Sequence, residues 1–243
     1  MFNIFLGREK KLEKARIKLI SDLEVGSIDF LISQMTNHEV YSPLLEKKQK
    51  RESTWSSTDY ITWYAYERAR ELSSENDKKK LLLKLNSESD SSIKNHIYYC
   101  LSHICANSTD SKLFNFLMEK LEIEDNEECK VSILFGLRNM IKDLSCNLEP
   151  LKKMIHTKSI ALKRMSISAL SHVNDKDVED LLLDIFKNKK DNHIRATVCF
   201  PLESVGTKKA IPVLNEVYKK TRDFGLRNDI ERVIAFIKER ENG

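Results

Sequence analysis

The feature that most constrains this sequence is an internal repeat of 32 to 36 residues. In six segments a short polar residue is followed four positions later by an anchor residue, which is usually basic, and then by a helix-like apolar pattern. The openers are Thr58, Asp90, Asn126, Ser159, Asp191 and Asp223, and the anchors are Thr62, Lys94, Lys130, Lys163, Arg195 and Arg227. Because Thr, Asp, Asn and Ser accept hydrogen bonds from the free amides at a helix start, the alignment has a physical basis.

Each repeat is expected to consist of two antiparallel helices. Positions −1, +3, +7 and +10 from the anchor are mainly apolar, as in Cys129, Ile133 and Leu137, with Ser166 as an exception. Shorter apolar patterns between these second helices predict the first helices. Gly26-Ser27 and Ser42-Pro43 predict further helix starts upstream. We therefore expect an all-α fold, an α-solenoid of about seven helix pairs forming one domain over residues 1–243, with divergent repeats in 1–57 and clear repeats in 58–241.

Composition supports this class. Six glycines and four prolines are too few for the frequent turns of a β-sandwich or an α/β fold. A net charge of +4 gives no strong general attraction to nucleic acid or membranes, and no apolar run has membrane-spanning length. Five cysteines without a CxxC pair are expected to be buried thiols in a reducing compartment, which predicts a cytoplasmic protein.

The later repeats resemble a known family. The pattern Asp-x-x-x-Arg at 191–195 and 223–227, and the segment from Gly206 to Leu214, are similar to HEAT repeats, especially to the bacterial phycobilisome-lyase-like branch. The resemblance covers roughly residues 58–241 and is strongest from 159 onward. It implies a curved superhelix with the second helices on the concave side, a scaffold that binds proteins, and basic anchors that form a ladder with acidic turn residues of neighbouring units. Thr62 and Pro201, which lies inside a second helix, depart from the family pattern.

A binding face is expected at positions +1, +5 and +8 from each anchor, because about 100° per residue directs these positions away from the apolar stripe. Aromatic and arginine residues alternate there, and these types are enriched at binding hot spots. The expected partner-binding residues are Trp63, Arg70, Tyr99, Phe135, Arg138, Arg164, Phe200 and Arg232. They predict a protein or peptide partner, although some of the rings could instead pack against neighbouring helices.

No nucleotide-binding, hydrolase or metalloprotease motif occurs, so we expect a non-enzymatic protein with no cofactor and no metal. His96, Cys100 and His103 share a helix face but lack a fourth ligand. One alternative is a nucleic-acid-binding module or a HEAT-like enzyme that processes DNA bases. It would use the basic clusters 47–51 and 78–80 near the aromatic segment 55–66. A third hypothesis takes the lyase resemblance literally and assigns a role in bilin attachment.

Overall fold

The structure, a computed structural model, describes residues 2–45 and 56–242, with side chains from residue 7 onward. These residues form helices and turns with two isolated bridges and no strand, which confirms the all-α prediction. The chain divides into two compact units, Met1–Ile104 and Cys105–Gly243, which we call unit 1 and unit 2. We describe each unit by itself, and the expectation of one continuous domain remains a prediction.

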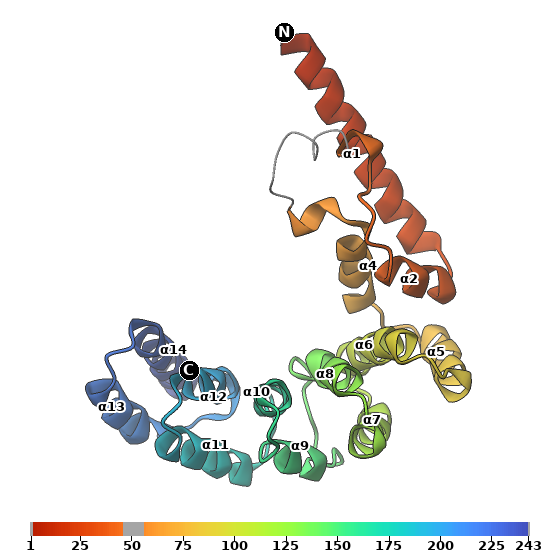
Figure 1. Ribbon diagram of the computed structural model, residues 1–243. Helices are drawn as coiled ribbons and strands as arrows, with labels where there is room; N and C mark the ends of the chain where they lie inside the picture. Colours follow the sequence, from red (N-terminus) through yellow and green to blue (C-terminus); the bar gives the residue numbers. More distant parts are fainter. Residues whose placement is uncertain (1, 46–55, 243) are drawn as a thin grey trace. The chain divides into compact units, whose positions relative to one another are not determined.

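Unit 1 contains the divergent part of the chain (Figure 1). Its elements are α1 (Phe2–Val25), α2 (Ile28–Met35), the short 3-10 helix η1 (Ser57–Asp59), α4 (Ile61–Arg70), α5 (Glu75–Ser87) and most of α6 (Ser91–Ser108). The predicted helix start at Ser27 is confirmed, since its side chain caps α2. The helix expected after Ser42-Pro43 falls largely outside the described residues, so the count of seven pairs remains a prediction.

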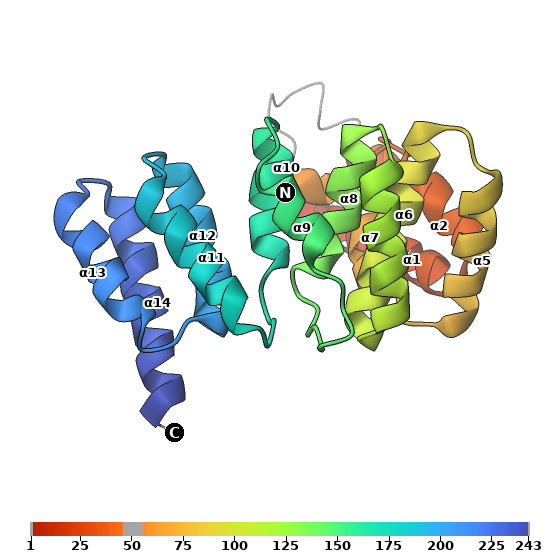
Figure 2. The same cartoon turned by 90° about the horizontal axis from the view of Figure 1, so that it is seen from below.

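Unit 2 is an α-solenoid built from alternating first and second helices. The first helices are α7 (Ser111–Ile123), α9 (Glu149–Met154), α11 (Lys176–Asn188) and α13 (Ala210–Lys220). The second helices are α8 (Glu127–Leu137), α10 (Ile160–Ala169), α12 (Asn192–Val205) and α14 (Phe224–Asn242). Figure 1 shows the first helices of this unit in a bowed row with the second helices on its inner side. Figure 2 shows the unit from the side of the first helices.

Helix starts in unit 2 follow the sequence prediction. The side chains of Asn126, Ser159 and Asp191 accept backbone amides at the starts of α8, α10 and α12. The predicted cap Thr58 is wrong, because it lies inside η1, where Ser56 is the cap. α4 then starts after Tyr60 without a side-chain cap. Residues 39–41 instead pair in extended conformation with residues 59–61, and the Tyr41 amide donates to the Asp59 carbonyl at 3.1 Å. This pairing fixes where α4 begins.

The apolar stripe forms the core, as predicted. Ile97, Ile133 and Val198 are fully buried, and so are all five cysteine thiols or nearly so. Pro201 is buried within α12, which continues through it as one helix. Among the helices of the described residues, none is long and apolar enough to span a bilayer.

Two of the basic anchors, Arg195 and Arg227, act within a repeat, and among the described residues no anchor forms the expected ion pair with a turn acid. Arg195 Nε donates to the Phe186 carbonyl at 3.0 Å, and Arg227 Nε donates to the Thr221 carbonyl at 3.0 Å. Each arginine therefore satisfies carbonyls at the end of the preceding first helix, where a positive charge also complements the helix dipole. Neighbouring repeats are joined instead by the cap residues, for example Asn192 to Asp223 at 3.3 Å.

Ser166 occupies a core position that the sequence pattern marks as an exception. Its hydroxyl is fully buried, and no hydrogen-bond partner for it is present among the described residues. A buried hydroxyl without a partner costs free energy, and alanine is also the better helix former. We expect Ser166→Ala to raise the free energy of unfolding by about 1 kcal/mol. Urea unfolding followed by circular dichroism would measure this, and a loss of stability would contradict it.

A buried lysine fastens the ends of two neighbouring second helices. Lys142, which is 2% exposed, donates from Nζ to the carbonyls of Leu137 at 2.8 Å, Met140 at 2.8 Å and Ser171 at 3.0 Å. The first two carbonyls lie at or just beyond the end of α8, and the third lies just beyond α10. The Lys142 amide also donates to the His172 carbonyl at 3.0 Å. This residue therefore sets how α8 lies beside α10.

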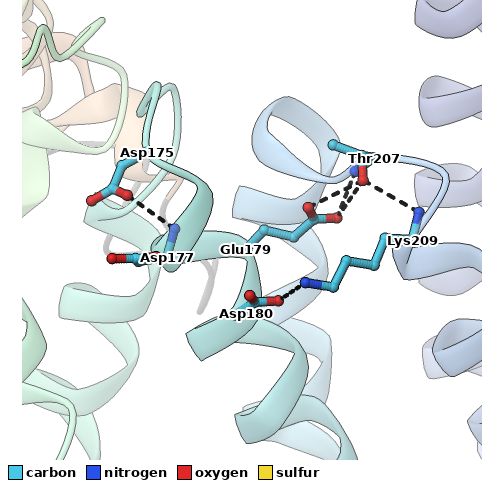
Figure 3. Close-up of polar contacts among 6 residues, drawn as sticks. All are labelled: Asp175, Asp177, Glu179, Asp180, Thr207 and Lys209. Carbon is cyan, nitrogen blue, oxygen red and sulfur yellow. Dashed lines mark hydrogen bonds and ion pairs between the residues drawn. The ribbon is translucent and has the colours of Figure 1, made fainter.

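A buried carboxylate fastens α11 to the turn that precedes α13 (Figure 3). Glu179, which is 5% exposed, accepts the Thr207 amide at 2.7 Å and the Thr207 hydroxyl at 3.1 Å. The next residue, Asp180, forms an exposed ion pair with Lys209. Two consecutive residues of α11 thus contact the following repeat, one through buried hydrogen bonds and one through an exposed ion pair.

Candidate functional site

A groove of about 510 Å³ crosses three successive second helices of unit 2. Its lining residues are Val131 and Arg138 at α8, Ala161, Arg164, Met165 and Ser168 on α10, and Ala196 and Thr197 on α12. Five of these occupy the +1, +5 or +8 positions that define the predicted face. The described lining contains small apolar side chains, two arginines and no carboxylate.

Arg138 follows the last residue of α8 and is held against an aromatic ring. Its guanidinium carbon lies 4.7 Å from the centre of the Phe135 ring, a cation–π contact that orients the group. Its Nε is buried and has no hydrogen-bond partner among the described residues. A buried donor without an acceptor is costly, so this nitrogen destabilises the site, and a ligand would meet the terminal nitrogens of the guanidinium group.

Arg164 is held in place by a hydrogen bond to the neighbouring helix α12. Its Nε donates to the Thr197 hydroxyl of α12 at 3.1 Å, and that hydroxyl donates to the His193 carbonyl at 2.8 Å. The side chain itself is exposed. In the part of the chain that the structure describes, neither Arg138 nor Arg164 forms an ion pair. The two guanidinium groups therefore keep their charge available to a partner.

The other predicted site residues of unit 2 are less available. Phe135 and Phe200 are half-buried, and Phe135 supports Arg138. Arg232 is exposed but pairs with Glu203 at 2.6 Å and with Asp229 at 2.9 Å. These carboxylates raise the pKa of Arg232 and neutralise its positive charge. Arg232 therefore links α12 to α14 and is a weaker candidate for partner binding.

The prediction that Tyr99 of unit 1 is exposed on the binding face is wrong. Tyr99 is 6% exposed, its hydroxyl accepts Arg70 Nε at 2.9 Å, and its ring packs edge-on against Tyr66. Arg70 also pairs with Glu67 at 2.6 Å. The lateral packing that sequence analysis left open is what occurs here, because the ring turns toward the neighbouring helix α4.

Trp63 is 37% exposed and lines a different pocket, in unit 1. Three carboxylates and one arginine line that pocket, which does not favour binding of nucleic-acid phosphates there. The basic cluster 47–51 lies outside the described residues. Lys79 and Lys80 are exposed on α5, as expected for a solvated face.

His96, Cys100 and His103 share a helix face but contact groups that are not metal ligands of one site. His96 Nδ1 lies 3.0 Å from the Tyr66 hydroxyl, and the Cys100 thiol donates to the Met35 sulfur at 3.8 Å. Burial raises the pKa of Cys100 to about 12, which keeps it a neutral thiol and a poor metal ligand. No cluster of metal-binding groups occurs within residues 7–45 and 56–242.

Three groove residues were missed by the sequence prediction: Ala161, Met165 and Thr197. They lie at −2, +2 and +2 from their anchors. Position −2 is seven residues before +5, so the two share nearly the same helix face, and the pattern could have included Ala161. The face pattern does not include Met165 and Thr197 at +2, because it is defined on a single helix. These two residues line the groove through the position of the neighbouring second helix.

The fold and the groove define the class: an α-solenoid of paired helices that presents a basic groove on its inner helices. Residues 148–235 match the family of HEAT repeats, so this segment, from α9 into α14, consists of HEAT repeats. The resemblance seen in the sequence is thereby confirmed for its strongest part, and its extension toward residue 58 remains a prediction. No curated protein matches the chain.

Proposed function

We propose that this protein is a non-enzymatic binding scaffold that holds an acidic segment of another protein in the groove of α8, α10 and α12. HEAT repeats commonly serve protein interactions, which is the general basis of the proposal. The observation that carries it is the pair Arg138 and Arg164, two unpaired guanidinium groups in a groove whose described lining has no carboxylate.

The chemistry of the groove suggests what the segment contains. Arginine binds carboxylates through two parallel hydrogen bonds, and the rigid placement of both side chains lowers the entropy lost on binding. The lining also includes the apolar side chains of Val131, Ala161 and Met165. The favoured ligand is therefore a peptide in which acidic residues alternate with small or medium apolar residues. The five buried thiols fit our proposal that this takes place in a reducing compartment such as the cytosol.

The test measures fluorescence anisotropy of short labelled peptides built from Glu, Ala and Leu, with matched peptides in which Lys replaces Glu. Wild type is expected to bind the acidic set. Arg138→Ala and Arg164→Ala should each weaken binding about tenfold, and the double variant about a hundredfold, because each lost charge-assisted hydrogen bond is worth about 1.5–3 kcal/mol.

Arg222→Ala is the matched control, because Arg222 is exposed in the same unit and does not line the groove. It should leave affinity within about twofold. Equal loss in the control and in the groove variants would reduce the effect to net charge and contradict the proposal. Preference for the lysine peptides would contradict it as well.

A further inference from the structure

Another hollow, in unit 1, is lined by acidic and aromatic residues. It lies between α1, α4 and residues 41 and 58–59 of the segment that joins α2 to α4, with a volume of about 510 Å³. Its lining residues are Glu9, Leu12, Glu13 and Arg16 of α1, Tyr41, Thr58 and Asp59 of the joining segment, and Trp63 and Tyr64 of α4. Three aromatic rings and three carboxylates thus meet in one pocket.

The rings present faces at different angles. Tyr41 and Tyr64 lie 5.7 Å apart between ring centres and are nearly perpendicular, at 85°. Trp63, the neighbour of Tyr64 in α4, adds an indole that is 37% exposed. We call Tyr41, Trp63 and Tyr64 the cage. Aromatic rings that line a hollow attract a cation wherever a ring face is open to it, and tryptophan binds cations more strongly than tyrosine or phenylalanine does.

The charges reinforce the rings. Arg16 binds Glu13 through two hydrogen bonds, at 3.0 and 2.7 Å, so this pair contributes little net charge. Burial raises the pKa of Tyr64, and the Arg16 guanidinium, which also interacts with that phenol, acts to lower it by a smaller amount. Asp59 accepts the Ser56 amide through one oxygen at 3.1 Å, and Glu9 is exposed and unpaired among the described residues. Glu9 and Asp59 therefore give the pocket a negative field. The pKa of Tyr41 is raised chiefly by burial and further by Tyr64 and Asp59, whereas Arg16 acts to lower it.

The backbone holds the cage in shape before any ligand enters. The Tyr41 amide donates to the Asp59 carbonyl at 3.1 Å, and the Ile61 amide donates to the Glu39 carbonyl at 2.9 Å. These two bonds fix Tyr41 beside the start of α4, which carries Trp63 and Tyr64. A cage that needs little ordering loses less free energy on binding.

We infer that this pocket binds an alkylammonium group, such as the side chain of lysine or methylated lysine or a small free quaternary amine. Quaternary and methylated ammonium ions suit it best, because they are large enough to touch several rings and are weakly hydrated. This inference goes beyond the proposed scaffold function and uses other residues, so either can fail without the other.

The test uses full-length protein with Trp55→Phe, so that Trp63 is the one fluorescent tryptophan. The probes are a short peptide with one trimethyllysine, the same peptide with the neutral carbon isostere of that side chain, the unmodified lysine peptide, and free choline. The trimethyllysine peptide is expected to change the Trp63 emission and to bind at least tenfold more tightly than the neutral isostere. Binding by the peptides alone would identify a protein lysine as the source of the group, and equal binding of choline would identify a small free amine.

Variants locate the site. Trp63→Ala should weaken binding at least tenfold by calorimetry, Trp63→Phe less, and Asp59→Asn and Glu9→Gln severalfold each. Phe30→Ala is the matched control, since that ring is also 37% exposed in unit 1 but does not line the pocket. The double variant Arg138→Ala with Arg164→Ala should bind the cation like wild type. The inference is overturned if no probe binds at about 5 mM, if the neutral isostere binds equally well, or if Trp63→Ala binds like the Phe30→Ala control.

Discussion

Replacement of Lys142 by methionine is expected to lower the free energy of unfolding of unit 2 by about 2–4 kcal/mol. Methionine keeps most of the volume of the side chain but leaves the carbonyls of Leu137, Met140 and Ser171 without this donor. Removing a buried amine also removes a desolvation cost. That gain is smaller than the loss, because the three acceptors are backbone groups that the substitution cannot replace with apolar ones.

The effect of Lys142→Met is expected to depend on pH. Burial lowers the pKa of Lys142 from 10.5 to about 7, so between these values the unfolded chain binds one proton more than the folded chain. Stability from this group therefore rises with pH across that window, and below pH 7 its contribution is constant. The difference between wild type and Lys142→Met should widen from pH 7.5 to 9.5, by at most about 1.4 kcal/mol per unit.

Urea unfolding followed by far-ultraviolet circular dichroism would measure both effects. Both tryptophans, at positions 55 and 63, belong to unit 1, so tryptophan emission gives an internal comparison in the same samples. Lys176→Met, which removes an exposed lysine of unit 2, is the control and should change stability by less than about 0.5 kcal/mol. A Lys142→Met variant as stable as this control would show that the hydrogen bonds of Lys142 contribute nothing to stability. A destabilisation that stays flat with pH would contradict the lowered pKa of Lys142.

Glu179→Ala is expected to destabilise unit 2 by about 2–3 kcal/mol. The substitution leaves the Thr207 amide and hydroxyl without their acceptor in a buried site (Figure 3). Glu179→Gln should cost less than about 1 kcal/mol, because its amide oxygen can still accept the Thr207 amide. Thermal and urea unfolding of the same three proteins would check this order.

Asp180→Ala is the control that distinguishes the loss of buried hydrogen bonds from the loss of a negative charge. Asp180 is the neighbour of Glu179 and reaches the same turn through Lys209, but both partners are exposed. Exposed ion pairs contribute about 0–1 kcal/mol, so this variant should remain close to wild type. If Asp180→Ala were as harmful as Glu179→Ala, the buried hydrogen bonds would not be what joins α11 to α13.

The sequence by itself determined the helices, their order and their buried faces. Helix caps such as Asn126 and Asp191, and apolar spacing such as Ile133 to Leu137, act over a few residues, so a linear pattern records them directly. The same local geometry placed Arg138 and Arg164 on one face, and these residues do line the groove. For that reason five of the eight groove residues lie at positions that the sequence pattern assigns to the binding face.

Only the tertiary structure decided which of those charges remain available and where the links between repeats lie. Arg232 is paired by Glu203 of another helix, and Tyr99 is covered by α4, contacts that no local spacing encodes. Lys142 and Glu179 gave no signal in the sequence, since a lysine or a glutamate in a charged segment is usually solvated. Their burial depends on how one repeat is offset against the next, which is set by the packing of helices distant in the chain.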